Sequence, residues 1–257
     1  MPKPNLLWGR VAIKETIWDA VDSVARAYDF ERHPYFVWAA AAETTREEFL
    51  ATQLPFRFAV EAFSQSLAAV LARMPRVEDR IHVAENVAEE HGHGNLAGSH
   101  KYTFLEYLRA LGAEDAHLEE PCPIWVTAFN HALRNLCLAQ QYEVGAAALG
   151  MIEHLYTHVS ASIARLIAER DWVPPDSQRH YATHEVLDVE HARELLEVAE
   201  PGWQAARTRS YVALGLLLGA YHFWTLYEDL LPGTEALDPS VAALLEAKEL
   251  EARKDDA

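Results

Sequence analysis

The sequence predicts an all-α protein, and three observations support that fold class. Ala, Leu, Glu and Arg dominate the 257 residues, and the apolar positions recur at intervals of three and four, as on amphipathic helices. Strand signals are nearly absent, because no Asn-Gly or Asp-Gly turn links segments of alternating polarity. Half of the residues are hydrophobic, which is enough to bury a sizeable core.

Helices are expected wherever this period persists, and residues that commonly begin or end helices separate them. The first break contains Pro34, and Thr44 or Thr45 is expected to cap the helix that follows. Pro75 marks the next break, and Ser99 closes the glycine-containing loop "HGHGNLAGSH" as the expected cap of another helix. The stretches "DWVPPDSQ" and "AEPGW" are the remaining stops. The expected ranges are 9–28, 44–73, 76–93, 100–112, 122–138, 140–170, 178–198, 203–231 and 238–253.

One domain of residues 1–257 is expected, because the chain has no internal repeat, no low-complexity linker and no change in composition. Its core spans about 9–231, and 238–257 form a C-terminal helix with a charged tail. The apolar run within 211–231 is about a dozen residues long before His222, short of the roughly 20 that cross a membrane. We therefore expect a central core helix there.

Charge and cysteine content exclude several classes of protein. The net charge of −17 argues against a nucleic-acid surface, and no basic amphipathic segment suits an anionic membrane. Cys122 and Cys137 are too few for a disulfide framework and are expected as free thiols in helical stretches. The first residues, "MPKPNLLWGR", lack the apolar core of a signal peptide, so we expect a cytoplasmic protein.

The segment "HEVLDVEH", residues 184–191, spaces two imidazoles and a carboxylate by four and then three positions. On an α-helix, steps of four and seven return to within roughly 40° of the starting direction. His184, Asp188 and His191 would therefore form one stripe, which can bind a metal ion or be a solvated polar face.

Two other segments offer partners for that stripe. Glu153 follows Gly150 by three and Ala146 by seven, so small residues line its helical face. They leave space for a metal or substrate, or else Gly150 permits close helix packing and Glu153 pairs with an arginine. In 84–104, Glu90 ends one helix and His100 opens the next, with apolar residues continuing its face inward. His93, three positions after Glu90, is the rival of His100, whereas His91 cannot share the face of Glu90.

Together these segments give three carboxylates and three imidazoles from separate helices. The set is Glu90, His100, Glu153, His184, Asp188 and His191. Helical carboxylate proteins use such ligands for two iron or manganese ions. The absence of thiolates argues against a structural zinc site.

On these residues the chain resembles the haem-oxygenase-like diiron oxidases, relatives of the TenA and PqqC folds. The resemblance runs from "HPYF" at 33 to about 231. It rests on "HxxxDxxH" at 184–191, on "NVAEEHG" followed by "SH" and a helix ending "LRALG" (86–112), and on Glu153, 31 residues before His184.

The resemblance implies two Fe(II) ions, or an Fe/Mn pair, with O2 as co-substrate. One ion would be held by Glu90 and His100 and the other by the 184–191 helix, with Glu153 bridging or closing the site. Which histidine belongs to which ion stays open. Glu61 is a further carboxylate candidate, with pairing to Arg57 as the alternative.

The implied activity is oxidation of a small organic substrate (an amino acid, amine or carboxylic acid) through a peroxo intermediate. N-oxygenation, C–C cleavage and oxidative decarboxylation are the reactions found among such relatives. Tyr35, Tyr156, His222 and Trp224 are candidate pocket residues. The carboxylate-binding candidates, which the sequence does not rank, are Arg57, Arg134, Arg165, Arg207 and Arg209.

One subtype of these relatives makes p-aminobenzoate from its own side chains and is thought to need a lysine on the Glu153 helix. Here lysines stand at positions 3, 14, 101, 248 and 254, and the Glu153 helix contains none. That activity is therefore disfavoured, although Tyr35 and Tyr156 are candidate pocket tyrosines.

Two other readings compete with the diiron oxidoreductase. A TenA-like hydrolase or a cofactor-free PqqC-like oxidase would share the fold, and a hydrolase would need a reactive cysteine. A non-catalytic helical binding protein would leave the 184–191 stripe as a solvated face. The expected partners are a small-molecule substrate, an external reductant and, as a candidate assembly, a second copy in a homodimer.

Overall fold

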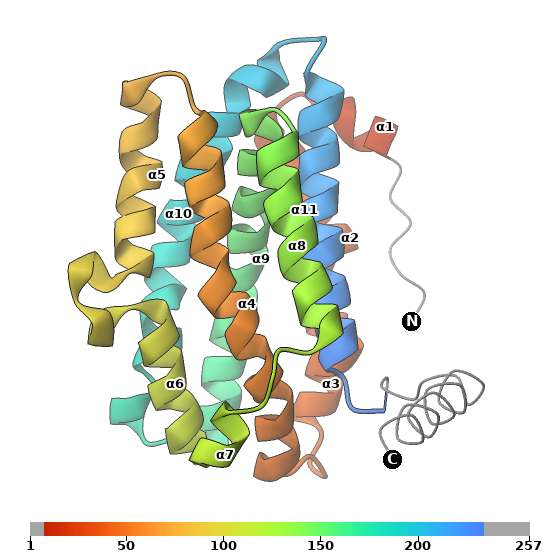
Figure 1. Ribbon diagram of the computed structural model, residues 1–257. Helices are drawn as coiled ribbons and strands as arrows, with labels where there is room; N and C mark the ends of the chain where they lie inside the picture. The colour runs from red at the N-terminus through yellow and green to blue at the C-terminus, as the bar shows by residue number, and fades with distance from the viewer. Residues whose placement is uncertain (1–7, 234–257) are drawn as a thin grey trace, which may run out of the picture.

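Long helices run side by side along one axis and make up almost all of the structure (Figure 1). The computed structural model of the chain describes residues 8–233, except the side chains of Trp8, Arg179 and residues 182–188. No strand occurs among these residues, which confirms the all-α prediction. The expected helix 238–253 lies outside the described residues.

The first half of the chain contributes the helices α1 to α6. Their bounds are α1 (Trp8–Ala12), α2 (Ile17–Ala27), α3 (Pro34–Ala40), α4 (Arg46–Arg73), α5 (Val77–Glu90) and α6 (His100–Leu111). The short 3-10 turns η1 (Phe30–Arg32), η2 (Gly92–Gly94) and η3 (Leu96–Gly98) lie between them. Thr45 caps α4 in a capping box with Glu48, as one of the two expected threonines. Ser99 holds the N-cap position of α6, but its hydroxyl donates to the carbonyl of Leu96.

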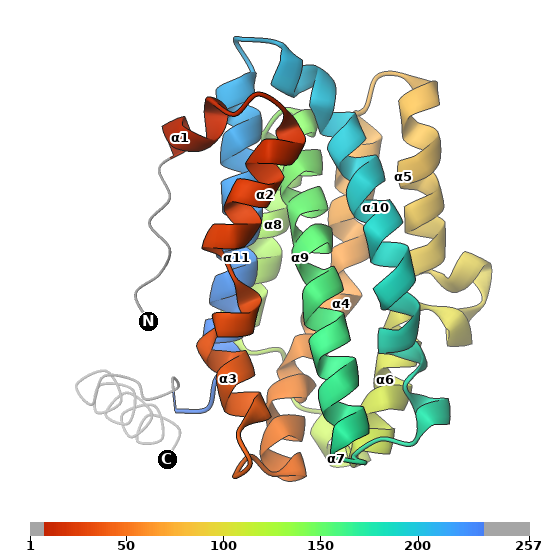
Figure 2. The ribbon, with the colours of Figure 1, turned by 180° about the vertical axis from the view of Figure 1, so that it is seen from behind.

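The second half contributes α7 to α11, with α9 at the centre. Their bounds are α7 (Asp115–Leu118), α8 (Ile124–Ala139), α9 (Tyr142–Glu169), η4 (Pro175–Ser177), α10 (Arg179–Gln204) and α11 (Arg209–Leu230). α9 packs most extensively against α10 and α11, while α4 packs against α8, α6 and α5. Seen from behind, α1, α2 and α3 lie along α9 and α11, on the side away from α5 (Figure 2).

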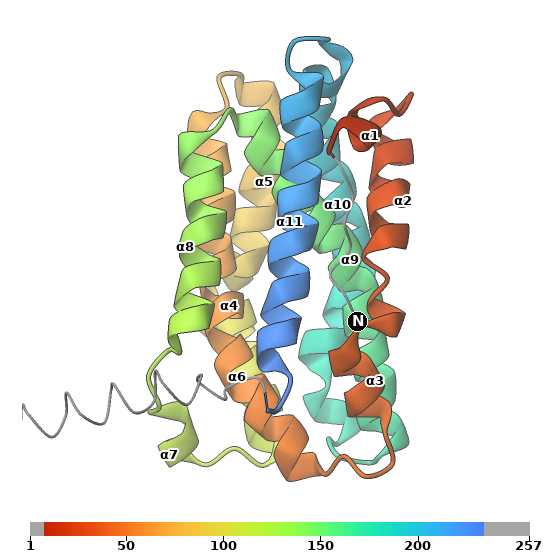
Figure 3. The same cartoon turned by 90° about the vertical axis from the view of Figure 1, so that its right-hand side faces the viewer.

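Glycines set the close approach of α9 and α11. A Cβ at Gly215 or Gly219 would collide with the backbone carbonyl of Val144 or Ala148 on α9. More than half of the residues of α11 are buried. In the view from the side, α11 stands between α8 on one side and α2 and α3 on the other (Figure 3). α11 packs into the core as expected, but it is not enclosed on all sides, because Tyr211 and Tyr221 are exposed. In the part of the chain that the structure describes, no helix has the length and apolar composition to cross a membrane.

The expected helix ranges are wrong in several places. The helix expected at 76–93 ends at Glu90, and the short helices α3 and α7 were not expected. Two breaks between helices also differ. The helix expected at 9–28 is interrupted at 13–16, because Thr16 starts α2 with a capping box to Asp19. The break expected at "AEPGW" is absent, because α10 continues through Pro201 to Gln204. Ala199 and Trp203 are fully buried on either side of this proline, and their packing holds the last turn despite the missing N–H.

Candidate metal centre

A cavity of about 60 Å³ lies among the helices, and five polar side chains of the described residues line it among mostly apolar walls. This volume is several times the ~10–15 Å³ that one water molecule needs. The apolar lining is Phe56, Ala59, Val60, Phe63, Phe129, Ile152, Phe223 and Leu226. The polar lining is Glu90, His100, Glu153, Tyr156 and His180. Three of the six predicted metal ligands therefore face one cavity.

Glu90 and His100 meet at this cavity because the loop between α5 and α6 folds back on itself. The Oε1 of Glu90 lies 2.9 Å from the Nδ1 of His100, and each residue is 7% exposed. Gly92 makes the turn with a φ of +61°, and a Cβ there would lie 2.6 Å from the backbone of Gly98 and Ser99. The end of α5 and the start of α6 are thereby brought together.

Glu153 enters the same cavity from α9 and is 4% exposed. Gly150, one turn before it, serves close packing instead of leaving open space. A Cβ at Gly150 would lie 2.9 Å from Cγ of Leu196 and 3.2 Å from Cβ of Leu195, both on α10. Gly150 therefore serves close helix packing, as one interpretation of this face expected, while Glu153 faces a cavity, as the other expected.

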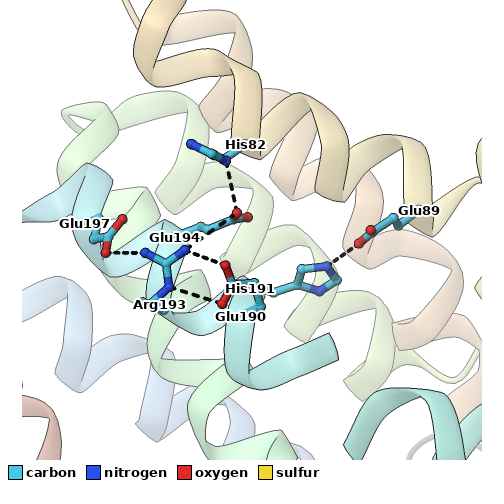
Figure 4. Close-up of polar contacts among 7 residues, drawn as sticks. All are labelled: His82, Glu89, Glu190, His191, Arg193, Glu194 and Glu197. Carbon is cyan, nitrogen blue, oxygen red and sulfur yellow. Dashed lines mark hydrogen bonds and ion pairs between the residues drawn. The ribbon is translucent and has the colours of Figure 1, made fainter. Parts of the chain in front are cut away.

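The 184–191 stripe lies on α10, which is helical throughout this segment as its spacing requires. The side chains of His184 and Asp188 lie outside the described residues. His191 is 3% exposed, and its Nε2 contacts the carboxylate of Glu89 on α5 (Figure 4). Among the described residues, Nδ1 of His191 is buried without a hydrogen-bond partner.

Glu89 and Glu90 are consecutive on α5 but have different partners. Successive helical residues point about 100° apart. Glu90 therefore reaches His100 on α6, while Glu89 reaches His191 on α10. A second link between α5 and α10 joins His82 Nδ1 and Glu194 Oε1 at 3.0 Å (Figure 4).

The two further metal candidates lie away from the cavity. Glu61 is exposed on α4, and its Oε1 lies 2.6 Å from Nζ of Lys101 instead of pairing with Arg57 as the alternative expected. His93 is exposed, with Nδ1 3.9 Å from Glu85. Its nearest acidic neighbours are at the surface, where one ligand atom each of Glu85, Glu89 and His93 lie within 4.8 Å of one another.

Of the four pocket candidates, only Tyr156 lines the cavity. Tyr35 is fully buried elsewhere, with its hydroxyl 2.8 Å from Thr52 Oγ1, and burial raises its pKa. Burial lowers the pKa of the half-buried His222. The indole of Trp224 donates to Glu228 at 3.1 Å. The pattern did not distinguish pocket positions from ordinary core positions.

Arginine and cysteine side chains contribute nothing to the described lining of the cavity. Arg57 is buried and donates to the carbonyls of Leu54 and Glu120. Burial raises the pKa of the Cys137 thiol to about 12, and Cys122 accepts a hydrogen bond from Thr127. The buried Cys137 thiol therefore lacks the lowered pKa that a nucleophile at neutral pH requires.

His180 is the cavity residue that the sequence reading missed. It is 2% exposed on α10 and lines the cavity beside His100, whose ring centroid is 6.0 Å away. It precedes His184 by four residues, so the stripe of α10 extends one turn towards the helix start. That spacing was the available signal.

Comparisons with known proteins identify the family and the fold of this chain. A family model described as iron-containing redox enzyme matches residues 51–222. The 4-aminobenzoate synthase of Chlamydia muridarum (strain MoPn / Nigg) is 27% identical over 191 residues, which cover 72% of this chain and 79% of that protein.

Solved structures confirm the haem-oxygenase-like fold. A domain of unknown function with a heme oxygenase-like fold from Shewanella denitrificans OS217 superposes with a TM-score of 0.69 at 13% identity, covering 85% of this chain and 92% of that one. A TenA homologue from P. horikoshii OT3 gives a TM-score of 0.64 at 11% identity, covering 84% and 98%. At these identities the likeness concerns the fold alone.

Proposed function

Because the chain belongs to the family of iron-containing redox enzymes, we propose that it uses two iron ions and O2 to oxidise a small organic substrate. The observation that carries the proposal is the meeting of Glu90, His100 and Glu153 at one buried cavity. These three residues come from three helices, and 63 positions separate Glu90 from Glu153.

The residues fit an iron site in their chemistry. Carboxylates and imidazoles without thiolates suit iron and manganese, and the described lining brings Glu90, His100 and Glu153 to one cavity. A metal ion would add positive charge between the two buried carboxylates.

His191 supplies a second indication of fit. A carboxylate accepts hydrogen bonds only, so Nε2 of His191 donates to Glu89 and the lone pair of the neutral ring resides on Nδ1. This nitrogen is buried without a hydrogen-bond partner among the described residues. An imidazole that donates one N–H to a carboxylate and binds metal through its other nitrogen is the usual arrangement of a histidine ligand.

In this proposal Glu90 and His100 hold one ion, the α10 residues His184, Asp188 and His191 hold the other, and Glu153 bridges or closes the site. Bound ferrous ions would supply the electrons that activate O2. Glu89 orients His191, and the apolar walls exclude water from the reacting groups. An iron–manganese pair would suit the same ligands.

The relative named 4-aminobenzoate synthase raises a specific alternative for the product. The helix of Glu153 contains no lysine. Lys101 is exposed, its Nζ lies 2.6 Å from Oε1 of Glu61, and it does not line the cavity. We therefore favour oxidation of an external substrate over formation of 4-aminobenzoate from side chains of this chain. Mass spectrometry of the protein and of small molecules after reaction with O2 separates the two outcomes.

Ferrous titration under anaerobic conditions, with elemental analysis, tests the metal site. We expect two ions per chain in the wild type and a loss of at least one in Glu90→Gln. Glu78→Gln, on the exposed side of the same helix, is the matched control and should keep both. Iron uptake of zero or one per chain in the wild type would contradict the dinuclear site, and so would full uptake by Glu90→Gln.

A further inference from the structure

Asn86 is a buried polar residue outside the predicted ligand set. It is 1% exposed on α5, between Val83 and Glu90 on the buried stripe of that helix. Among the described residues, neither its Oδ1 nor its Nδ2 has a hydrogen-bond partner. A buried amide without hydrogen bonds destabilises a protein, so a polar occupant is expected beside it.

The position of Asn86 on α5 places it beside two acidic residues that contact histidines of the candidate metal centre. Asn86 precedes Glu89 by three positions and Glu90 by four. Residues at these spacings are neighbours on a helix, with Cβ atoms about 5–6 Å apart. Glu89 contacts His191 on α10, and Glu90 lies beside His100 on α6. The amide therefore lies one helical turn from both contacts.

His191 brings a second unsatisfied group to the same part of the structure. Its Nε2 contacts Glu89, while its Nδ1 is buried without a hydrogen-bond partner in the part of the chain that the structure describes. An amide oxygen and the lone pair of an imidazole nitrogen both donate electron pairs. A cation accepts from both of them, whereas a carboxylate or a backbone carbonyl accepts from neither.

We propose that Oδ1 of Asn86 is a further ligand of the iron centre, on the ion that His191 binds. This inference rests on the proposed function of the same site. The carboxamide adds a neutral oxygen ligand to the carboxylates and imidazoles. Its Nδ2 then donates to a carboxylate oxygen of the same centre, so that both polar atoms of the buried amide gain a partner.

Replacing Asn86 with leucine should affect the metal-free and the loaded protein in opposite directions. Asn86→Leu keeps a side chain of similar size but removes both polar atoms. The thermal unfolding midpoint of the metal-free variant should rise by about 2–4 °C, because no buried amide stays unpaired. Its affinity for Fe(II), measured by anaerobic titration, should fall at least about tenfold.

Asn86→Asp should give the opposite pattern. It keeps an oxygen at the position of Oδ1, so it should bind Fe(II) at least as tightly as the wild type. The metal-free variant should unfold at a lower temperature at neutral pH, because it buries a carboxylate. A role of Asn86 in packing alone cannot produce these opposite signs.

Val83→Ala is the matched packing control, one turn earlier on the same buried stripe of α5. It should lower the unfolding midpoint and leave the affinity for Fe(II) unchanged, because it removes apolar contacts only. Far-UV circular dichroism shows whether each variant has folded.

An unchanged affinity for Fe(II) in folded Asn86→Leu would overturn the proposal, as would equal losses of affinity in Asn86→Leu and Asn86→Asp. A metal-free Asn86→Leu that is less stable than the wild type would also overturn it, because the amide would then have a partner without metal. Failure of the proposed function is distinguishable. A wild type that takes up no Fe(II) refutes both, whereas normal uptake with unchanged affinity in Asn86→Leu refutes this inference alone.

Discussion

Replacing Gly92 with alanine should damage both the stability of the protein and its iron binding. Gly92 has a φ of +61°, and the left-handed conformation costs a residue with a side chain about 1–2 kcal/mol. A Cβ at this position would also lie 2.6 Å from the backbone of Gly98 and Ser99, which has no flexible end that can move aside. Relieving such overpacking adds about 1–3 kcal/mol.

Gly94→Ala is the matched control for this variant. Gly94 has a φ of +85° in the same loop, but nothing lies within 4 Å of a Cβ built there. It should therefore incur the conformational cost alone, about 1–2 kcal/mol. The difference between the two variants measures the close packing that brings His100 to Glu90.

Urea unfolding followed by circular dichroism gives the free energy of unfolding of each variant, and ferrous titration gives its iron content. Gly92→Ala should be the less stable variant and should bind iron more weakly, because the shifted loop moves His100. Gly94→Ala should bind iron like the wild type. Equal stability and equal iron uptake in the two variants would refute the role assigned to the Gly92 contact.

Three further predictions concern single side chains. Glu153→Ala and His184→Ala should abolish O2-dependent oxidation but keep the helical circular dichroism, and wild-type oxidation rates in both would place the site elsewhere. Glu89→Gln should weaken binding of one ion and leave the other, because it alters the acceptor of His191; unchanged iron affinity by titration would count against this role. Burial lowers the pKa of His33 to about 4, so the free energy of unfolding should fall by up to about 1.4 kcal/mol per pH unit from about pH 6.5 towards 4. His33→Asn should flatten this pH dependence in urea unfolding, and an unchanged slope would exclude His33 as its source.

The helical fold could be predicted from the sequence because its signals are local. The period of three and four identified the helices, and Thr45 was one of two expected caps. The break expected at Pro201 was wrong, because α10 continues through this proline. The continuation depends on the tertiary packing of Trp203, which no local pattern reveals. Thr16 was missed because its capping box uses Asp19 within an otherwise continuous helical pattern.

The candidate site could be predicted where its residues are close in the sequence. The glycine loop implied that Glu90 and His100 converge, and the structure places them 2.9 Å apart. The contact of Glu89 with His191 joins residues 102 positions apart and required the packing of α5 on α10. Tyr35 was indistinguishable by sequence from a pocket residue, since burial in the core and burial at a cavity follow the same pattern.

Anomalous diffraction at the iron edge from crystals of the ferrous-loaded protein tests the central claim most directly. The diiron account predicts two peaks, one beside Glu90 and His100 and the other beside the 184–191 segment of α10, with Glu153 between or next to them. A single peak at this cavity would contradict the account. So would peaks confined to the surface group of Glu85, Glu89 and His93.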